Sequence, residues 1–259
     1  MNKKGLYKKV SGGRTISYKL KYSLAQLDKK KCMKWKDWRK SMNNLEAAKQ
    51  EVLKGCRLTI EKAFTVGTAG NISARVAGEE LFVITPTTMD YAILTAEDLV
   101  VMDMEGKVVD GKYAPSIEHN LHRLIYLKRP DVNAVVHVHS TYATAYASIE
   151  GITVMPSIDI ESINYLGGDV DRCPFAAPGS DELAAYTSDY LGKKAAVLMQ
   201  NHGSTCVGKD MGTAITACEI VEKTCYSLFL INTMGKPIPF DAAFKEKAWN
   251  KYSNKFGVK

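Results

Sequence analysis

The segment that constrains the fold most is residues 195–199, an uninterrupted apolar run with the length of a β-strand. A strand that is apolar on both faces has no side for water, so it belongs inside a sheet that is covered on both faces. Around it, short β-rich segments alternate with segments of helical periodicity, and neither a linker nor an internal repeat separates them. The pattern predicts one α/β domain.

The remaining elements follow from periodicity and capping residues. Apolar residues three and four positions apart predict helices at residues 44–63 and 116–128, and weaker patterns predict helices at 141–149, 181–191 and after 241. Asp210 is expected to cap a long helix that ends near residue 233, and residues 95–98 are typical of a helix start. A strand at 134–139 and two hairpins, 72–76 with 81–84 and 100–104 with 107–109, complete the prediction.

The basic character of the chain is confined to its N-terminus. Residues 1–40 hold 14 Lys and Arg against 2 Asp and Glu, a net charge of +12, whereas the other 219 residues hold 21 against 26, a net charge of −5. Such a segment can attract nucleic acid or anionic lipid, but a solvated tail has the same composition. We expect residues 1–41 to be a loosely attached basic extension with no nucleic-acid partner, and residues 42–259 to be the functional domain.

Composition excludes several classes of protein. Apolar residues make up 46% of the chain and charged residues 24%, which is typical of a globular protein and excludes wholesale disorder. No run of 18 apolar residues is present, so we expect no membrane span, and the N-terminus lacks the apolar core of a secretion signal. The six cysteines form no C-x-x-C pair, which indicates free thiols in a reducing, cytoplasmic location.

Histidines are rare in the chain, and two of the five lie two positions apart. Side chains alternate between the faces of a strand, so His137 and His139 share one face with Val135 in the strand expected at 134–139. Neighbouring neutral imidazoles can bind one Zn²⁺ or a similar ion, although two histidines in a polar face would show the same spacing. The pattern marks a candidate metal site.

A third histidine and a carboxylate could complete this site. His202 follows the apolar strand 195–199, where a rigid strand reaches solvent. Glu118 lies in the first turn of the helix expected at 116–128, where the helix dipole alone would also favour an acid. Three histidines and one carboxylate give the tetrahedral shell that Zn²⁺ prefers. On the same helix, His119 and His122 are competing ligands.

Several small or hydroxylated residues could hold an anion. Residues 67–71 form a glycine-rich loop without the lysine of a P-loop, and its Thr68 and Asn71 can donate hydrogen bonds. Thr87 and Thr88, after the strand at 81–84, and Ser116, at a helix start, offer further donors. Each of them also fits an ordinary turn or cap, so only their convergence would indicate a site.

Five segments, in this order along the chain, resemble the class II aldolase/adducin family. They are residues 67–73 (GTAGNIS), 84–87 (ITPT), 115–118 (PSIE), 129–139 (RPDVNAVVHVH) and 201–203 (NHG). The resemblance covers about residues 44–240. It implies a three-layer αβα fold around a central, largely antiparallel sheet, and a homotetramer whose active site lies at a subunit interface.

The resemblance also implies an activity, with residues 42–259 as the catalytic domain. The divalent metal, usually zinc, would be held by His137, His139 and His202. Glu118 corresponds to the acid/base residue of the family, which can also join the metal shell. The substrate phosphate would be held by Thr68, Asn71, Thr87, Thr88 and Ser116. The implied reaction is cleavage of a small ketose 1-phosphate to dihydroxyacetone phosphate and an aldehyde.

The sequence departs from the family pattern at three positions. Ile117 stands where family aldolases carry a second serine, and Thr88 stands where a glycine is usual. The proton-donating tyrosine of the family has no clear match; Tyr165 is the nearest candidate, followed by Tyr252. L-Fuculose 1-phosphate is the first choice of substrate, and a 5-deoxy-pentulose 1-phosphate is next because Ile117 indicates an altered pocket.

Other functions within the family stay open. The 4-epimerases carry aspartate where Glu118 stands and a second aspartate near Asn164, which favours an aldolase over an epimerase or a dehydratase. An adducin-like binding module would keep the fold without catalysis. The retention of all three histidines and of Glu118 argues against such a module.

Overall fold

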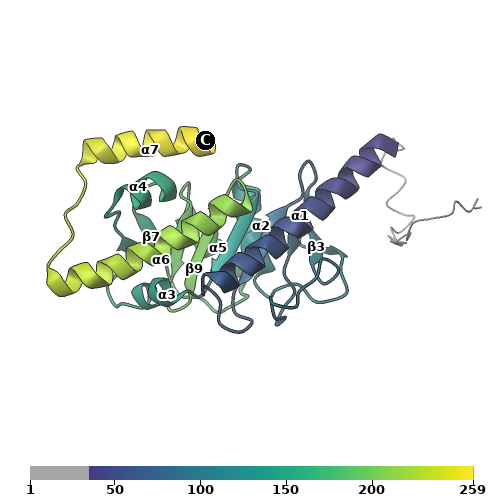
Figure 1. The fold of residues 1–259 in the computed structure, drawn as a ribbon, viewed down its shortest axis with the longest axis horizontal. Coiled ribbons are helices and arrows are strands. Elements are labelled where there is room, and N and C mark those ends of the chain that lie inside the picture. Colours follow the sequence, from purple (N-terminus) through teal and green to yellow (C-terminus); the bar gives the residue numbers. More distant parts are fainter. Residues whose placement is uncertain (1–34, 259) are drawn as a thin grey trace, which may run out of the picture. The chain divides into compact units, whose positions relative to one another are not determined.

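The structure, a computed structural model, describes residues 35–258, so most of the extension expected at residues 1–41 lies outside the described residues (Figure 1). The helices are α1 (Trp35–Glu61), α2 (His119–Lys128), α3 (Thr141–Ala147), α4 (Ile160–Leu166), α5 (Asp181–Leu191), α6 (Met211–Met234) and α7 (Ala242–Phe256). The strands are β1 (Asn71–Arg75), β2 (Leu81–Ile84), β3 (Val100–Asp103), β4 (Val108–Asp110), β5 (Ala134–Val138), β6 (Val154–Met155), β7 (Val170–Cys173), β8 (Ala196–Met199) and β9 (Gly203–Gly208).

The strands of the described chain form one nine-stranded sheet, in the order β4-β3-β2-β1-β5-β9-β8-β7-β6. Neighbouring strands are antiparallel except β7 and β8, which are parallel. Both expected hairpins are present, as β1 with β2 and β3 with β4. The apolar strand β8 is buried along its whole length, which confirms its interior position.

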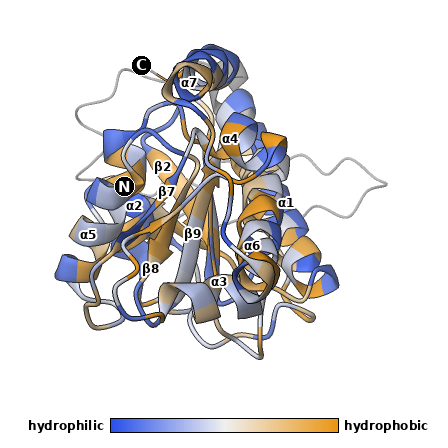
Figure 2. Cartoon of the chain, turned by 90° about the vertical axis from the view of Figure 1, so that its left-hand side faces the viewer, coloured by the Kyte–Doolittle hydropathy of each residue, from blue (hydrophilic) through white to orange (hydrophobic). Residues whose placement is uncertain are grey.

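Helices cover both faces of this sheet, as Figure 2 shows edge-on. α1, α3 and α6 pack on one face, mainly against β1, β5 and β9, while α2 and α5 pack side by side on the other. The three-layer αβα fold around a largely antiparallel sheet is therefore confirmed. Within residues 35–258, no helix is both long enough and apolar enough to cross a membrane.

The strand β5 separates the two cores of the domain. Ala134, Val136 and Val138 are buried in one hydrophobic cluster with residues of α1 and α6. Val135 is buried in a second cluster with residues of α2 and α5. Burial of each valine side chain stabilises the folded state by about 1.5–3 kcal/mol. A slip of this strand by one residue would therefore lower stability on both faces of the sheet. The alternation directs His137 to the α2 side.

The predicted start of the first helix is wrong. α1 begins at residue 35 and not at residue 44, so residues 35–41, expected in the extension, are helical. These residues include neither glycine nor proline, and a helix that is already nucleated propagates through such a segment. Asn44 lies within the helix, and its side-chain amide donates a hydrogen bond to the Ala77 carbonyl at 2.8 Å.

The helix start expected at residues 95–98 is only a turn. The Asp98 carboxylate accepts hydrogen bonds from the Thr95 backbone N–H at 2.9 Å and from the Thr95 hydroxyl at 2.6 Å, as a helix cap would. The chain enters β3 at residue 100, before a helix can propagate. Asp210 does cap α6 as predicted, with its carboxylate accepting from the Thr213 N–H at 2.7 Å.

The central strand β9 has no counterpart in the prediction. Its sequence begins and ends with glycine, which ordinarily weakens a strand. Both glycines are required by close approach of other backbone. A Cβ on Gly203 would lie 2.3 Å from the Val138 carbonyl oxygen, and one on Gly208 would lie 2.5 Å from the Ala214 nitrogen.

The substitution Gly208→Ala tests this packing. The added methyl would overlap backbone atoms at the start of α6, so we expect the free energy of unfolding to fall by about 1–3 kcal/mol. Gly235→Ala is the matched control, because no atom lies within 4 Å of its Cβ position and its φ of 170° is open to any residue. Urea unfolding measures both, and equal stability of the two variants would contradict the packing argument.

Candidate metal centre and active site

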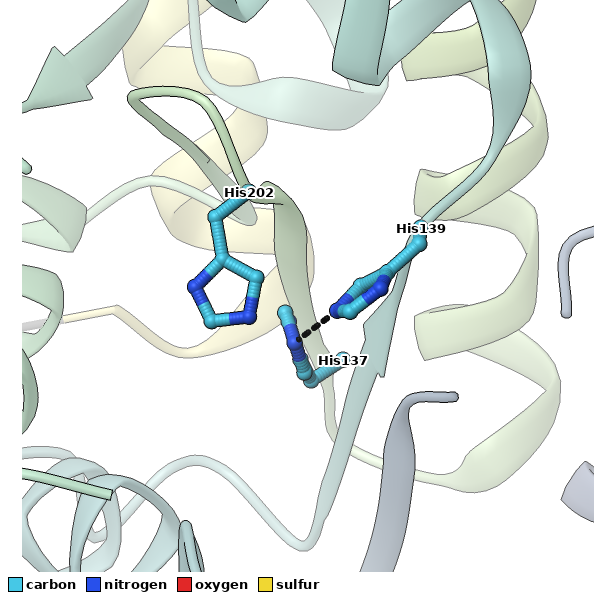
Figure 3. A group of neighbouring side chains, drawn as sticks. All are labelled: His137, His139 and His202. Carbon is cyan, nitrogen blue, oxygen red and sulfur yellow. Dashed lines mark hydrogen bonds between the residues drawn. The ribbon is translucent and has the colours of Figure 1, made fainter. Parts of the chain in front are cut away.

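The candidate site lies where β5 ends. His137 is the fourth residue of that strand, and His139 follows its last residue. β5 pairs antiparallel with β9, with Val138 opposite Ser204, so the turn that carries His202 reaches the same end of the sheet. Figure 3 shows the three imidazoles facing one another. One nitrogen from each ring lies within 4.8 Å of the other two.

Backbone contacts fix the orientation of His137. Its Nδ1 lies 3.0 Å from the carbonyl oxygen of Ser204. A carbonyl only accepts hydrogen bonds, so Nδ1 carries the proton and Nε2 presents a lone pair. That Nε2 lies 2.9 Å from Nε2 of His139, so two ring nitrogens converge on one point. A carbonyl that fixes the tautomer of a ligating histidine is the usual outer-shell contact of a metal site.

The electrostatics keep the three rings neutral. Burial lowers the pKa of His137 well below its ordinary value, and the nearby His202 and His139 lower it further. Burial is also the main cause of the lowered pKa values of His139 and His202. A neutral imidazole is the form that coordinates a metal, since the proton and the ion compete for the same lone pair.

Glu118 reaches the same point from the other layer. It occupies the N-cap position of α2, which begins at His119 and not at Ser116 as predicted. Its Oε1 lies 3.4 Å from Nε2 of His202, and its Oε2 lies 3.4 Å from Nε2 of His137. The side chain is 6% exposed, and Oε1 is buried without a hydrogen-bond partner. One unsatisfied carboxylate oxygen beside three neutral imidazoles fits a divalent metal ion.

The strand register brings one predicted anion-binding residue to the histidines. Asn71 is the first residue of β1 and lies opposite His137 of β5. Its Nδ2 donates a hydrogen bond to Oε2 of Glu118 at 2.7 Å. Asn71 therefore contacts the carboxylate directly, in addition to any contact with a bound anion.

Backbone contacts also join the segments that carry Ser116 and Thr87. The Ser116 N–H donates to the Thr85 carbonyl at 3.1 Å, and the Thr87 N–H donates to the Ala114 carbonyl at 3.1 Å. The Ser116 hydroxyl accepts from the Glu118 N–H at 3.3 Å, which ties this pair of segments to the carboxylate.

The other two predicted anion-binding residues are exposed. Thr88 has a φ of 53°, a left-handed conformation that costs a residue with a Cβ about 1 kcal/mol or more and that glycine adopts freely. The glycine usual at this position in the resembled family is thus explained by the backbone. Thr68 lies in the turn at residues 67–68, and no described hydrogen bond joins its side chain to the site.

The two candidate tyrosines lie elsewhere. Tyr165 of α4 carries the Lys255 ammonium 4.1 Å above its ring, and it lines a small cavity together with Arg129, Gly208 and Tyr252. This cavity lies where β9 ends and β5 is about to begin, at the opposite end of those strands from His137. Neither tyrosine is brought to the histidines by the described chain.

The two competing histidines are not among the converging ligands. Nδ1 of His119 lies 2.9 Å from the Ser116 carbonyl oxygen. His122 lies on the buried face of α2, where its ring contacts Asn71 and Ser73. Glu222 was not predicted from the sequence. Its carboxylate accepts from the hydroxyl of Ser140, the residue after His139, and from the N–H groups of Tyr142 and Ala143 in the first turn of α3. A charged residue within the apolar helix α6 was the available signal.

Comparisons with known proteins agree with this geometry. The family described as Class II Aldolase and Adducin N-terminal domain matches residues 50–229. The L-fuculose phosphate aldolase of Methanococcus maripaludis is 33% identical over 184 residues, covering 71% of this chain and 97% of the relative. The 5-deoxy-D-ribulose 1-phosphate aldolase of Bacillus thuringiensis is 29% identical over 197 residues, covering 74% of this chain and 89% of the relative.

Two further relatives extend the comparison. The 3-oxo-tetronate 4-phosphate decarboxylase of Haemophilus influenzae is 33% identical over 187 residues, covering 71% of this chain and 88% of the relative. Among solved structures, an L-fuculose 1-phosphate aldolase has a TM-score of 0.75 and 31% identity, covering 80% of this chain and 96% of its own. On its sequence, its fold and its cluster of histidines, the chain is a member of the class II aldolase and adducin family.

Proposed function

We propose that the chain is a zinc-dependent aldehyde-lyase that cleaves a small ketose 1-phosphate to dihydroxyacetone phosphate and an aldehyde. The observation that carries this proposal is the convergence of three neutral imidazoles and the unsatisfied Oε1 of Glu118. L-Fuculose 1-phosphate is the first substrate to test. A 5-deoxy-pentulose 1-phosphate is the second, and the names of two relatives support this order.

The roles proposed for individual residues follow from their positions. His137, His139 and His202 hold the metal, which when bound supplies positive charge beside the oxygen atoms on which negative charge develops. Glu118 exchanges the proton on the carbon next to the carbonyl through Oε1, the oxygen without a hydrogen bond. The strand β5, its pairing with β9 and the N-terminus of α2 hold these groups in place before the substrate binds.

The phosphate would be held beside this centre by backbone and side-chain donors. The residues that we propose for this role are Thr68, Asn71, Thr87, Thr88 and Ser116. Ile117, which follows Ser116, is 59% exposed and adds apolar surface where a serine would add a donor. We infer that this change alters substrate preference more than it alters chemistry, because the imidazoles and Glu118 are unaffected by it.

A decarboxylase is the second candidate, because one relative of equal identity acts on a 3-oxo acid phosphate. Loss of CO₂ from such a substrate also leaves negative charge beside the carbonyl, so the same metal centre would serve. A panel of ketose 1-phosphates and 3-oxo acid phosphates, assayed for dihydroxyacetone phosphate and for CO₂, separates the two reactions. An adducin-like binding module would release neither product.

We also propose that the chain assembles as a homotetramer, as the family resemblance implies. Exposed apolar side chains near the C-terminal end of α6 support assembly, since Phe229 is 58% exposed and Met234 is 80% exposed. Light scattering on the full chain measures the mass directly, and a monomer at micromolar concentration would contradict this proposal.

Metal binding is tested by the substitution His139→Ala. Loss of one of three imidazole ligands should reduce metal retained through gel filtration to a small fraction of the wild-type amount, and activity with it. His119→Ala is the matched control, since His119 lies on α2 outside the cluster and should leave the metal content unchanged. A chelator should abolish turnover and added Zn²⁺ should restore it; full activity of the stripped protein would exclude the metal mechanism.

The proton transfer is tested by the substitution Glu118→Gln. Glutamine keeps the size of the side chain and accepts from Asn71, but it cannot exchange a proton, so we expect kcat to fall by about 10²–10⁴-fold. Glu80→Gln, in the exposed turn between β1 and β2, should leave kcat unchanged. Steady-state assays of both variants decide the point, and wild-type turnover in the first would remove Glu118 from its role.

A further inference from the structure

A chain of buried hydrogen bonds runs from Glu118 along the interface between β1 and α2. Asn71 donates from Nδ2 to Oε2 of Glu118 at 2.7 Å, and its Oδ1 faces Nε2 of His122. Nδ1 of His122 lies 2.6 Å from the Ser73 hydroxyl, which lies 2.7 Å from the Tyr126 hydroxyl. All five side chains are at most 6% exposed, so water does not compete for these contacts.

The direction of each hydrogen bond in this chain is fixed by its neighbours. A carboxylate only accepts, so Asn71 presents its amide nitrogen to Glu118 and leaves Oδ1 for His122. An amide oxygen also only accepts, so Nε2 of His122 carries the ring proton. Burial lowers the pKa of His122 to about 3, so the ring is neutral and its Nδ1 must accept from Ser73. The Ser73 oxygen then accepts from the Tyr126 hydroxyl.

This directional order has a consequence for Asn71. The two ends of an amide have similar shapes, and while Glu118 holds a proton its carboxyl group could donate to an amide oxygen, so without His122 the Asn71 amide could turn its oxygen toward Glu118. The Nε2–H of His122 excludes that orientation, because it requires an acceptor. Asn71 and Ser73 lie opposite His137 and Val135 in the register of β1 with β5, so both belong to the face that carries the histidine cluster.

We propose that His122 is a positioning residue for the reaction: it holds the Asn71 amide so that Glu118 keeps one oxygen hydrogen-bonded and the other free for chemistry. This inference rests on the proposed role of Glu118. The helix α2 would then serve the reaction twice, by supplying the Glu118 carboxylate and by orienting the Asn71 amide through His122. The Tyr126 and Ser73 hydroxyls do not contact Asn71; they favour the His122 tautomer that carries its proton on Nε2.

Two isosteric substitutions separate positioning from packing. In His122→Gln the amide nitrogen can occupy the place of Nε2 and still donate to Asn71, whereas in His122→Asn the amide reaches only the place of Nδ1. Each variant loses one of two hydrogen bonds, so a purely structural role predicts similar effects. Positioning predicts that H122N loses about 10–100-fold in kcat with little change in KM, and that H122Q retains at least about ten times the kcat of H122N.

Metal content and thermal unfolding are measured on the same preparations, because they must be alike in the two variants for the comparison to hold. Equal kcat in both variants, or wild-type kcat in H122N, would overturn the inference while leaving the proposed function intact. A wild-type protein that binds metal but cleaves no phosphorylated sugar would remove the proposed function and this inference with it. If neither variant folds, Ser73→Ala keeps the ring and frees its tautomer, and unchanged kcat in that variant would overturn the inference.

Discussion

The arrangement of the site depends on one register, that of β5 between β1 and β9. It places Asn71 opposite His137 on one side and Thr205 opposite His137 on the other. Because side chains alternate along a strand, a slip of β5 by one residue would turn His137 away from α2 and from Asn71, and it would place the valines of β5 on the wrong faces. The same valines that stabilise the fold therefore determine where the polar groups lie.

Much of this centre could be predicted from the sequence, because its signals are local. A spacing of two places His137 and His139 on one face of any strand, and a polar turn after an apolar strand brings His202 to its end. The position of Glu118 was predicted within the first turn of α2, and it lies at the cap of that helix. Their convergence needed the family resemblance, since no local rule states which strands pair.

The parts that could not be predicted depend on contacts between distant segments. β9 contains two glycines that local rules treat as strand breakers, yet Val138 and Ala214 leave no room for a side chain there. Tyr165 matched the family only approximately, and the structure packs it against α7 at the far end of the strands. Glu222 acts on α3 across 79 to 82 positions of sequence, so only the folded chain reveals that it supports the residue after His139.

The close approach of Gly203 to Val138 limits how this centre can be varied. Any side chain at position 203 would push the turn that carries His202 away from β5, whereas Ile117 and Thr88 are exposed. We therefore expect substitutions at Gly203 to displace His202, whereas Ile117, which is 59% exposed, can vary without moving the three histidines. Evolution of substrate range within this scaffold is expected to follow the same division.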